Sequence, residues 1–179
     1  VEEDEGVSTH RKLADYHEDR IAARERTDRP DSKAQAHAGN YRKGKFFWKG
    51  LKIVFENPKG STRSGTTEDG KSWSVVMRHD YGYIGGTKSK ADGDAVDVFC
   101  GPDLDSELVF IVDQNKKDGS FDEHKCMIGF KSEEEARAAY ASNFSTGWKG
   151  FRSITAVTLP DFKEWLNSNK TGDAYARGK

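Results

Sequence analysis

At positions 91–98 the chain reads Ala91-Asp92-Gly93-Asp94-Ala95-Val96-Asp97-Val98, which places three carboxylates within six residues. The glycine allows a turn, and the apolar residues that follow predict a short strand over residues 96–100. Concentrated negative charge is costly unless a cation neutralises it, so the cluster indicates a bound metal ion. Magnesium takes oxygen ligands and keeps positions for water and phosphate. The alternative, a polar turn with solvated aspartates, stays open on this stretch alone.

Short apolar or alternating segments on both sides of this stretch predict a mainly β protein. The strands are expected at residues 51–56, 72–77, 96–100, 108–113, 121–130 and 153–159. A glycine-rich loop is expected over residues 81–94, and residues 117–120 form a hairpin turn. A capping box at Ser132 predicts a helix over residues 133–143, and Pro160 opens a last helix.

The first forty residues are charged and poor in aromatic and branched side chains. Residues 8–26 predict a helix with Ser8 or Thr9 as its N-cap and a thin apolar stripe, and residues 28–39 are typical of a linker. We interpret this arm as a solvated linker, with docking to a larger assembly as the alternative. The expected division is a charged N-terminal arm at 1–40, a folded domain at 41–170 and a flexible tail at 171–179.

Composition excludes several classes of protein. The mean hydropathy is -0.87, and no apolar run approaches the roughly 20 residues that a membrane span needs, so we expect no membrane contact. The 29 basic and 30 acidic residues give a net charge of -1, which argues against a nucleic-acid partner bound by bulk charge. Cys100 and Cys126 lie in apolar segments and are interpreted as buried thiols in a reducing cytoplasm, with a disulfide or a nucleophile as the alternative.

The N-terminus offers no signal for secretion, because it is acidic and lacks an apolar segment. The first residue is Val1 rather than Met, and we expect the chain to be a piece of a longer protein. The expected location is the cytoplasm.

Further polar blocks occur along the chain and strengthen the interpretation of a phosphate site. They are residues 56–61 at the end of the first strand, residues 81–84, Asp113, and residues 122–125 after the hairpin. Phosphate needs cationic partners, and the candidates are Lys59, Arg63, Lys71 and Lys125.

These blocks resemble, in the same order, the motifs of the soluble, magnesium-dependent (family I) inorganic pyrophosphatases. That family has E-[IV]-P-x-G-S at the end of a strand, then Y-G-[YF]-I, then D-G-D-P-x-D-V-L, then two further aspartates and a lysine. The chain matches at residues 56–61, 81–84 and 92–98, and the spacing from Tyr81 to Asp97 agrees. The resemblance covers about residues 47–166. It is closer still to the pyrophosphatase-like domains of phage and mobile-element polyproteins, which also carry a D-E-H-K block.

The resemblance implies a role for each matching residue. Two or more magnesium ions would be held by Asp92, Asp97, Asp113 and Asp122. Asp94 would hold the attacking water and help to deprotonate it, and Glu56 would support the metal–water network. The phosphate-binding residues would be Tyr81, Arg63, Lys125, Lys59, Lys71, Tyr140 and Lys149.

The chain departs from the family at its phosphate-binding cations. Residues 64–66 read Ser-Gly-Thr where the family has K-Y-E, and Arg63 is the candidate to replace the missing lysine. Lys71 is the candidate for a family arginine, and Lys149 for a lysine that is Ala141 here. This rearrangement predicts an altered rate or an altered substrate.

We therefore expect a mainly β protein with flanking helices (α+β). The resemblance implies a five-stranded antiparallel barrel of the OB type, with two helices in the C-terminal half and a helical or irregular N-terminal extension outside it. The expected function is magnesium-dependent hydrolysis of pyrophosphate or another phosphoanhydride. The alternatives are a module that binds metal and phosphate with little turnover, and an assembly domain of a phage polyprotein in the host cytoplasm. Protein partners would be further copies of the chain or that parent polyprotein.

Overall fold

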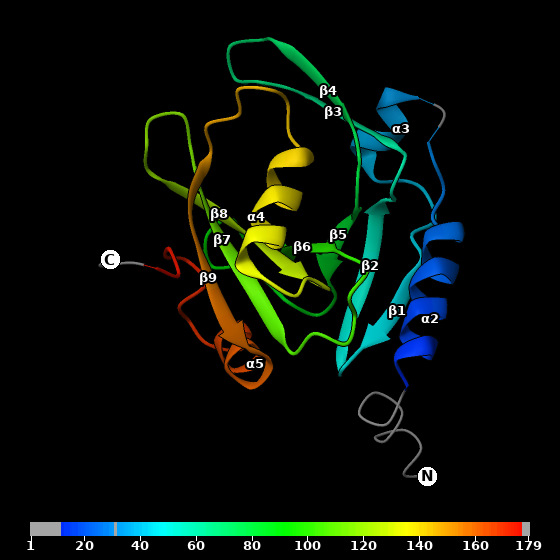
Figure 1. Ribbon diagram of the computed structural model, residues 1–179. Coiled ribbons are helices and arrows are strands. Elements are labelled where there is room, and N and C mark those ends of the chain that lie inside the picture. Colours follow the sequence, from blue (N-terminus) through cyan, green and yellow to red (C-terminus); the bar gives the residue numbers. More distant parts are fainter. Residues whose placement is uncertain (1–11, 31, 177–179) are drawn as a thin grey trace.

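A seven-stranded mixed sheet forms the centre of the protein, in the order β1-β2-β5-β6-β8-β7-β9 (Figure 1). The computed structural model describes residues 12–30 and 32–176. The strands of the sheet are β1 (Lys45–Trp48), β2 (Leu51–Asn57), β5 (Asp80–Ile84), β6 (Val96–Cys100), β7 (Leu108–Asn115), β8 (Phe121–Ile128) and β9 (Phe151–Thr158). A separate hairpin, β3 (Thr62–Thr66) and β4 (Ser72–Val76), projects beyond the sheet. The helices are α2 (Leu13–Glu25), α3 (Lys33–Ala38), α4 (Glu133–Ser142) and α5 (Leu159–Leu166).

The topology corrects the expected barrel while confirming the broad α+β class. The sheet has seven strands instead of five, and the pairing of β6 with β8 is parallel rather than antiparallel. The hairpin after β7 returns the chain as β8 into the space between β6 and β7, where it runs in the direction of β6. The described pairings extend from β1 at one edge to β9 at the other, so this part of the chain forms an open sheet.

Strand β5 lies where the sequence predicted a glycine-rich loop. It pairs with β2 on one side and with β6 on the other. Gly82 permits this, because a Cβ atom built there would lie 1.8 Å from the carbonyl oxygen of Val54 in β2. Gly82 is therefore required for the close approach of β5 to β2 and does not form a turn.

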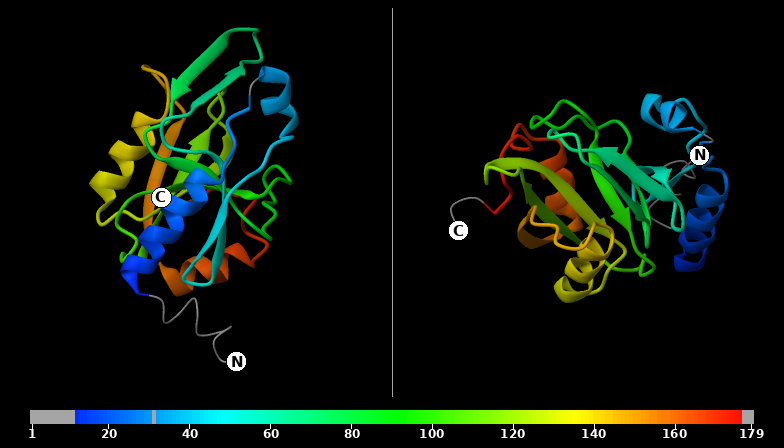
Figure 2. Two further views of the ribbon diagram at one scale, coloured as in Figure 1. Left: turned by 90° about the vertical axis from the view of Figure 1, so that its right-hand side faces the viewer. Right: turned by 90° about the horizontal axis from the view of Figure 1, so that it is seen from above.

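Alternating residues of the central strands bury two apolar cores, one on each face of the sheet. The first core contains Val98 and Ile111 of the sheet together with residues of α2 and α5. The second contains Phe99 and Val112 together with residues of α4. Figure 2 shows α2 and α4 on different sides of the sheet. The face below α4 is the one that also carries the candidate site.

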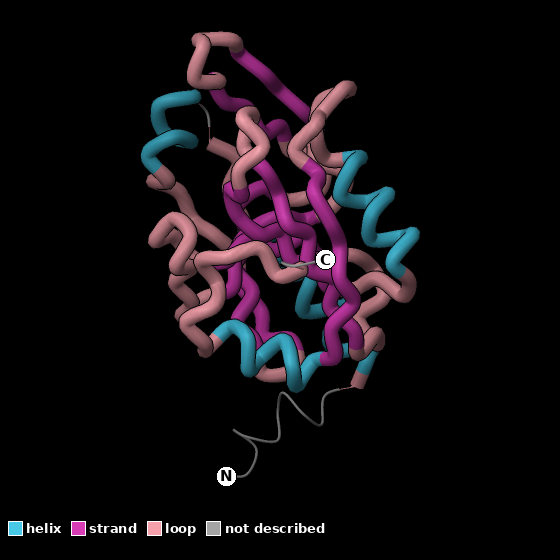
Figure 3. The backbone as a smooth tube through the Cα atoms, turned by 90° about the vertical axis from the view of Figure 1, so that its left-hand side faces the viewer, coloured by secondary structure: helices cyan, strands magenta, loops and turns pink. Residues whose placement is uncertain are grey.

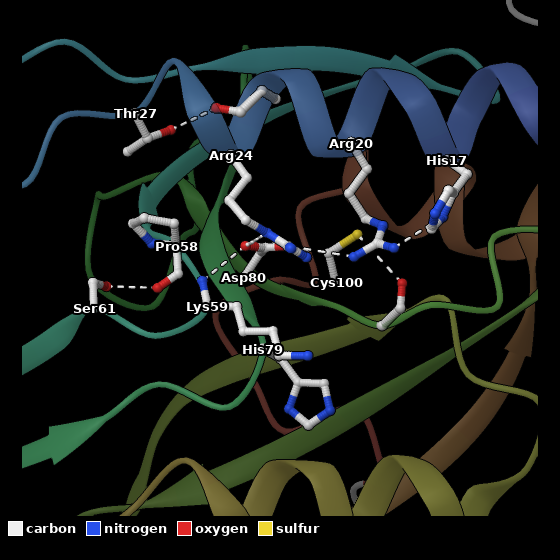
Figure 4. A network of polar contacts seen from close by, with 12 residues as sticks. His17, Arg20, Arg24, Thr27, Pro58, Lys59, Ser61, His79, Asp80 and Cys100 are labelled. Carbon is white, nitrogen blue, oxygen red and sulfur yellow. Dashed lines mark hydrogen bonds and ion pairs between the residues drawn. The ribbon is translucent and has the colours of Figure 1, made fainter.

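Helix α2 packs on β1 and β2, whereas we interpreted the arm as a solvated linker. Tyr16 and Ala23 of this helix are 4% and 0% exposed and belong to the first core. Arg20 and Arg24 reach the buried carboxylate of Asp80 at the start of β5 (Figure 4). The thin apolar stripe is thus supplemented by buried ion pairs. The predicted N-caps Ser8 and Thr9 lie outside the described residues.

Two other segments are more ordered than expected. The predicted linker contains α3, whose N-cap Ser32 accepts a hydrogen bond from the backbone of Gln35. The predicted flexible tail is anchored as far as residue 176, because the backbone N–H groups of Tyr175 and Ala176 donate to the carboxylate of Asp113. Figure 3 shows this C-terminal segment crossing the sheet.

The two later helices and the two thiols confirm the sequence analysis. Helix α4 begins after Ser132, whose side chain accepts from the N–H of Glu135, and α5 begins after Thr158 with Pro160 in its first turn. Cys100 and Cys126 are buried and free. In the described part of the chain, none of the helices has the length and apolar character required to traverse a bilayer.

Candidate active site

The parallel pairing of β6 with β8 places Asp97 opposite Lys125. The Lys125 ammonium group donates to Asp97 Oδ2 and to Tyr81 Oη, both at 2.7 Å, and lies 3.5 Å from Glu123 Oε2. We call these four residues the Lys125 cluster. Three of them, Tyr81, Asp97 and Lys125, had been selected from the sequence, and three neighbouring strands bring them together.

Lys125 and Asp97 both remain charged, because each lies close to the opposite charge of the other. Burial alone would lower the pKa of Lys125, but the carboxylate of Asp97, followed by the oxygen atoms of Tyr81 and Glu123, holds that pKa well above its usual value. Burial would likewise raise the pKa of Asp97, yet the charge of Lys125 and hydrogen bonds from Glu123, Lys125 and Tyr81 bring it below its usual value. The cluster therefore keeps an ammonium group and a carboxylate, both ionised, on the face below α4.

Acidic groups near Lys125 have shifted pKa values. Burial, followed by the charge of Asp97, raises the pKa of Glu56 above its usual value. Burial raises the pKa of Glu123 to about 8; the charge of Lys125 opposes this shift, and the charge of Asp97 adds to it. Three acidic groups thus lie around one buried lysine, and Arg63 and Lys43 are further cations near Glu56. Carboxylate oxygens of this kind are the ligands that magnesium takes.

Glu123 makes the stability of the metal-free protein depend on pH. Its folded pKa of about 8 exceeds the value of 4.5 for a free glutamate, so the folded state binds the proton more tightly. Stability should be fully present below pH 4.5 and should fall as pH rises towards 8, by at most about 1.4 kcal/mol per unit. Urea unfolding in EDTA across this range measures the effect. Glu123→Gln should lack this contribution, and an identical pH slope in both proteins would contradict the assignment.

The β3–β4 hairpin adds a second cation above the cluster. The guanidinium carbon of Arg63 lies 4.7 Å from the centre of the Tyr81 ring and 5.3 Å from the centre of the Trp73 ring. Within the hairpin Arg63 pairs with Val75 of β4, and Trp73 is its diagonal neighbour on that strand. A long side chain such as that of arginine can reach a diagonal neighbour. Arg63 thus brings a guanidinium group to the Tyr81 ring of the Lys125 cluster.

A chain of hydrogen bonds connects α4 with β7 and β8. Trp148 Nε1 donates to Tyr140 Oη at 2.8 Å, and that hydroxyl lies 2.8 Å from Gln114 Oε1. The amide nitrogen of Gln114 donates to Asp122 Oδ2 at 3.3 Å. Gln114 also pairs with Glu123 across β7 and β8. The candidates Tyr140 and Asp122 are therefore joined to the edge of the Lys125 cluster.

Asp92 and Asp94 lie in the exposed turn before β6. Asp92 Oδ1 accepts from the N–H of Asp94 at 3.0 Å, and Gly93 has a φ of 79°. A glycine is favoured at that position because other residues rarely adopt a positive φ. Within residues 12–30 and 32–176, no three Asp, Glu, His or Cys side chains are gathered closely enough to hold a metal ion. The three aspartates of the motif are thus near in sequence but do not converge.

Asp113 lies on the opposite face from the Lys125 cluster. Its fully buried carboxylate accepts from Ser153 Oγ at 2.7 Å and from the backbone of Tyr175 and Ala176 at 2.7 and 3.0 Å. His124 is paired with Asp113 across β7 and β8, and its Nε2 atom lies 3.4 Å from Asp113 Oδ1. Asp113 therefore anchors the C-terminal segment and does not lie with the other candidate ligands.

The three remaining candidate lysines lie on the surface. Lys59 uses its backbone N–H to donate to Asp80 Oδ1 at 2.8 Å, while its side chain is exposed. Lys71 follows the turn of the β3–β4 hairpin, and Lys149 lies in the loop before β9. Among the described residues, neither side chain contacts the Lys125 cluster.

A comparison with protein-family models matches residues 33–167 to the inorganic pyrophosphatase family. The chain belongs to the inorganic pyrophosphatase family. The match spans all seven strands of the sheet and the β3–β4 hairpin. Searches of the curated proteins and of the solved structures gave no match.

Two residues of this pyrophosphatase-family site were not selected from the sequence. Glu123 was overlooked in favour of Asp122, although residues two apart on a strand share a face and Glu123 precedes Lys125 by two. That spacing was the available signal. Gln114 had no comparable signal, because its role depends on the pairing of β7 with β8 and on the position of α4.

Proposed function

We propose that this pyrophosphatase-family chain is a magnesium-dependent phosphoanhydride hydrolase and that pyrophosphate is its main substrate. The observation that carries the proposal is the Lys125 cluster, which sits among the motif blocks in the order typical of the family. Its ammonium group is held charged and buried beside oxygen donors, which suits a phosphate oxygen and a metal ion side by side.

The available donors are carboxylates, the oxygen ligands that magnesium takes, although no three of the described Asp, Glu, His or Cys side chains lie closely enough together to hold an ion. We assign two or more ions to Asp92, Asp97 and Asp122, with Glu123 in the role that the sequence analysis gave to Asp113. Bound magnesium supplies charge neutralisation for the phosphate oxygens and makes a nearby water more acidic.

Side chains of the chain perform the remaining tasks. Asp94 accepts the proton of the attacking water, and Glu56 orders the surrounding water. Lys125 and Arg63 bind the phosphate oxygens. Tyr81 accepts from Lys125, and burial raises its pKa, so its O–H stays protonated; we propose that this O–H turns from Asp97 to a phosphate oxygen when substrate binds. We place Tyr140 at the far phosphate and give the surface cations Lys59, Lys71 and Lys149 the role of attracting the anion.

A second candidate function follows from the rearranged cations. Of the described lysines and arginines, only Lys125 and Arg63 contact members of the cluster. A site with so few cations would bind metal and phosphate with little turnover. We extend the proposal to a cytoplasmic setting, supported by the two free buried thiols, and to a phage polyprotein parent, supported by the shared D-E-H-K block.

Phosphate release from pyrophosphate tests the proposal. We expect release with magnesium in excess and only background release in EDTA, because the substrate charge is then not neutralised. A phosphate monoester, which lacks the anhydride bond, is the matched substrate control and should remain intact. Failure of the folded protein to release phosphate with magnesium present would overturn the hydrolase. If magnesium and a non-hydrolysable diphosphate still raise the melting temperature together, the binding module is the function.

A further inference from the structure

A cavity of about 630 Å³ opens beside α4, next to the proposed site but outside the Lys125 cluster. It lies between the second half of α4 and the segment that leads into β9. The residues that line it include Arg78, Arg137, Tyr140, Phe144, Trp148 and Phe151. Its volume lies in the range of small-molecule sites, and hydrolysis of pyrophosphate alone gives it no task.

The cavity is cationic and polar at its rim. Among the residues that line it are two arginines and four hydroxyl-bearing side chains, and none of the lining residues is acidic. The guanidinium carbon of Arg137 lies 4.3 Å from the centre of the Phe151 ring, and Arg78 is exposed at the other wall. Such a lining favours a ligand that carries phosphate.

The cavity also presents an aromatic surface. The rings of Trp148 and Phe144 are stacked, with centres 4.7 Å apart and planes at 12°. Trp148 nevertheless remains 43% exposed, whereas most large apolar side chains of the described chain are buried. An exposed indole stacked on a second ring offers an aromatic surface on which a nucleobase stacks.

Tyr140 forms the wall between the cavity and the catalytic face. Its hydroxyl is held by Trp148 on the cavity side and by Gln114 on the β7 side. Burial raises the pKa of Tyr140 to about 12, and Gln114, its hydrogen-bond partner, pairs with Glu123 of the Lys125 cluster across β7 and β8. A ligand stacked on Trp148 can therefore extend its phosphates past Tyr140 towards the cluster.

We infer that this cavity binds the base and sugar of a nucleoside di- or triphosphate and directs its phosphoanhydride to the Lys125 cluster. The hydrolytic part of this inference rests on the proposed function. For a triphosphate, the water oxygen bonds to the terminal phosphorus as the bond from that phosphorus to the bridging oxygen breaks. Asp94 takes the proton, and the products are phosphate and the nucleoside diphosphate.

Binding of AMP compared with ribose 5-phosphate tests the site without metal or turnover. Both carry one phosphate, and only AMP carries a base. Titration calorimetry should show AMP binding at least about tenfold more tightly. Trp148→Ala should remove the difference, and Trp148→Phe, which keeps a ring but loses the N–H, should retain most of it. Phe47→Ala, at a ring on β1 that is 50% exposed, is the matched control and should behave as wild type. Equal affinities of wild type for the two ligands would overturn the inference.

Hydrolysis of pyrophosphate and ATP by the same preparations separates this inference from the proposed function. Pyrophosphate hydrolysis without a base preference in binding would leave the hydrolase standing and overturn the nucleotide site. A base preference that Trp148→Ala removes, without hydrolysis of either compound, would support the nucleotide site and overturn the hydrolase. ATP hydrolysis that Trp148→Ala slows more than pyrophosphate hydrolysis would support both.

Discussion

Asp94→Asn should lower the magnesium-dependent rate of pyrophosphate hydrolysis by about 10²- to 10⁴-fold, the usual contribution of a general base. The amide keeps the size of the carboxylate but cannot accept the proton of the attacking water. Asp94 is exposed, and its backbone rather than its side chain makes the contacts with Asp92 and Ser89. The substitution should therefore leave the melting temperature of the metal-free protein unchanged.

Initial rates of phosphate release with saturating magnesium measure this effect. Asp105→Asn is the matched control, because it removes an exposed aspartate from the turn before β7 and should retain the full rate. An unchanged rate in Asp94→Asn, with Asp97→Asn inactive, would assign proton removal to another group of the site. Equal activity of Asp94→Asn and Asp97→Asn with wild type would contradict the location of the site altogether.

Motif order selected three residues that lie together in the candidate site, but it did not predict how they meet. Tyr81, Asp97 and Lys125 were found because each belongs to a block with a recognisable pattern. Their contact depends on the parallel pairing of β6 with β8, a non-local feature for which short-range periodicity has no signal. The role of Glu123 became evident only from the distance between its carboxylate and the Lys125 ammonium group.

Strand parity explains why Asp113 was misplaced. Asp113 ends a predicted strand, and the family resemblance implied that it is a metal ligand. Its partner in β8 is His124, whereas Gln114 is the residue paired with Glu123. A shift of one residue moves a side chain to the other face, so a ligand set cannot be fixed without the register.

Apolar patterning predicted most strands and the two later helices, but it failed where polar groups hold the fold. Helix α2 lacks a broad apolar stripe and was interpreted as part of a solvated arm. Its attachment relies on Arg20 and Arg24, which meet a carboxylate more than fifty positions away in the chain. Long-range ion pairs leave no periodic signal, so such a helix is underestimated by any argument from hydropathy.

Asp80→Asn should lower the free energy of unfolding by about 3–5 kcal/mol, the usual effect of removing one partner of a buried ion pair. Asp80 is 1% exposed and receives Arg24 Nε at 2.9 Å and Nη2 at 2.8 Å, with Arg20 Nη1 at 3.5 Å (Figure 4). An asparagine could still accept from the backbone of Lys59, but two guanidinium groups would lose their counter-charge. Urea unfolding at neutral pH measures the loss.

Asp28→Asn is the matched control for this prediction. Asp28 pairs with Arg42 at 3.3 Å, but the two side chains are 49% and 64% exposed, so its loss should cost no more than about 1 kcal/mol. Replacing Arg20, Arg24 and Asp80 together by apolar residues of similar size should restore most of the stability, because the charges are removed as a set. Equal, small losses in Asp80→Asn and Asp28→Asn would mean that α2 is held by Tyr16 and Ala23 alone. In that case the ion pairs would serve only to position the loop at Lys59, and the change should appear in the rate of hydrolysis instead.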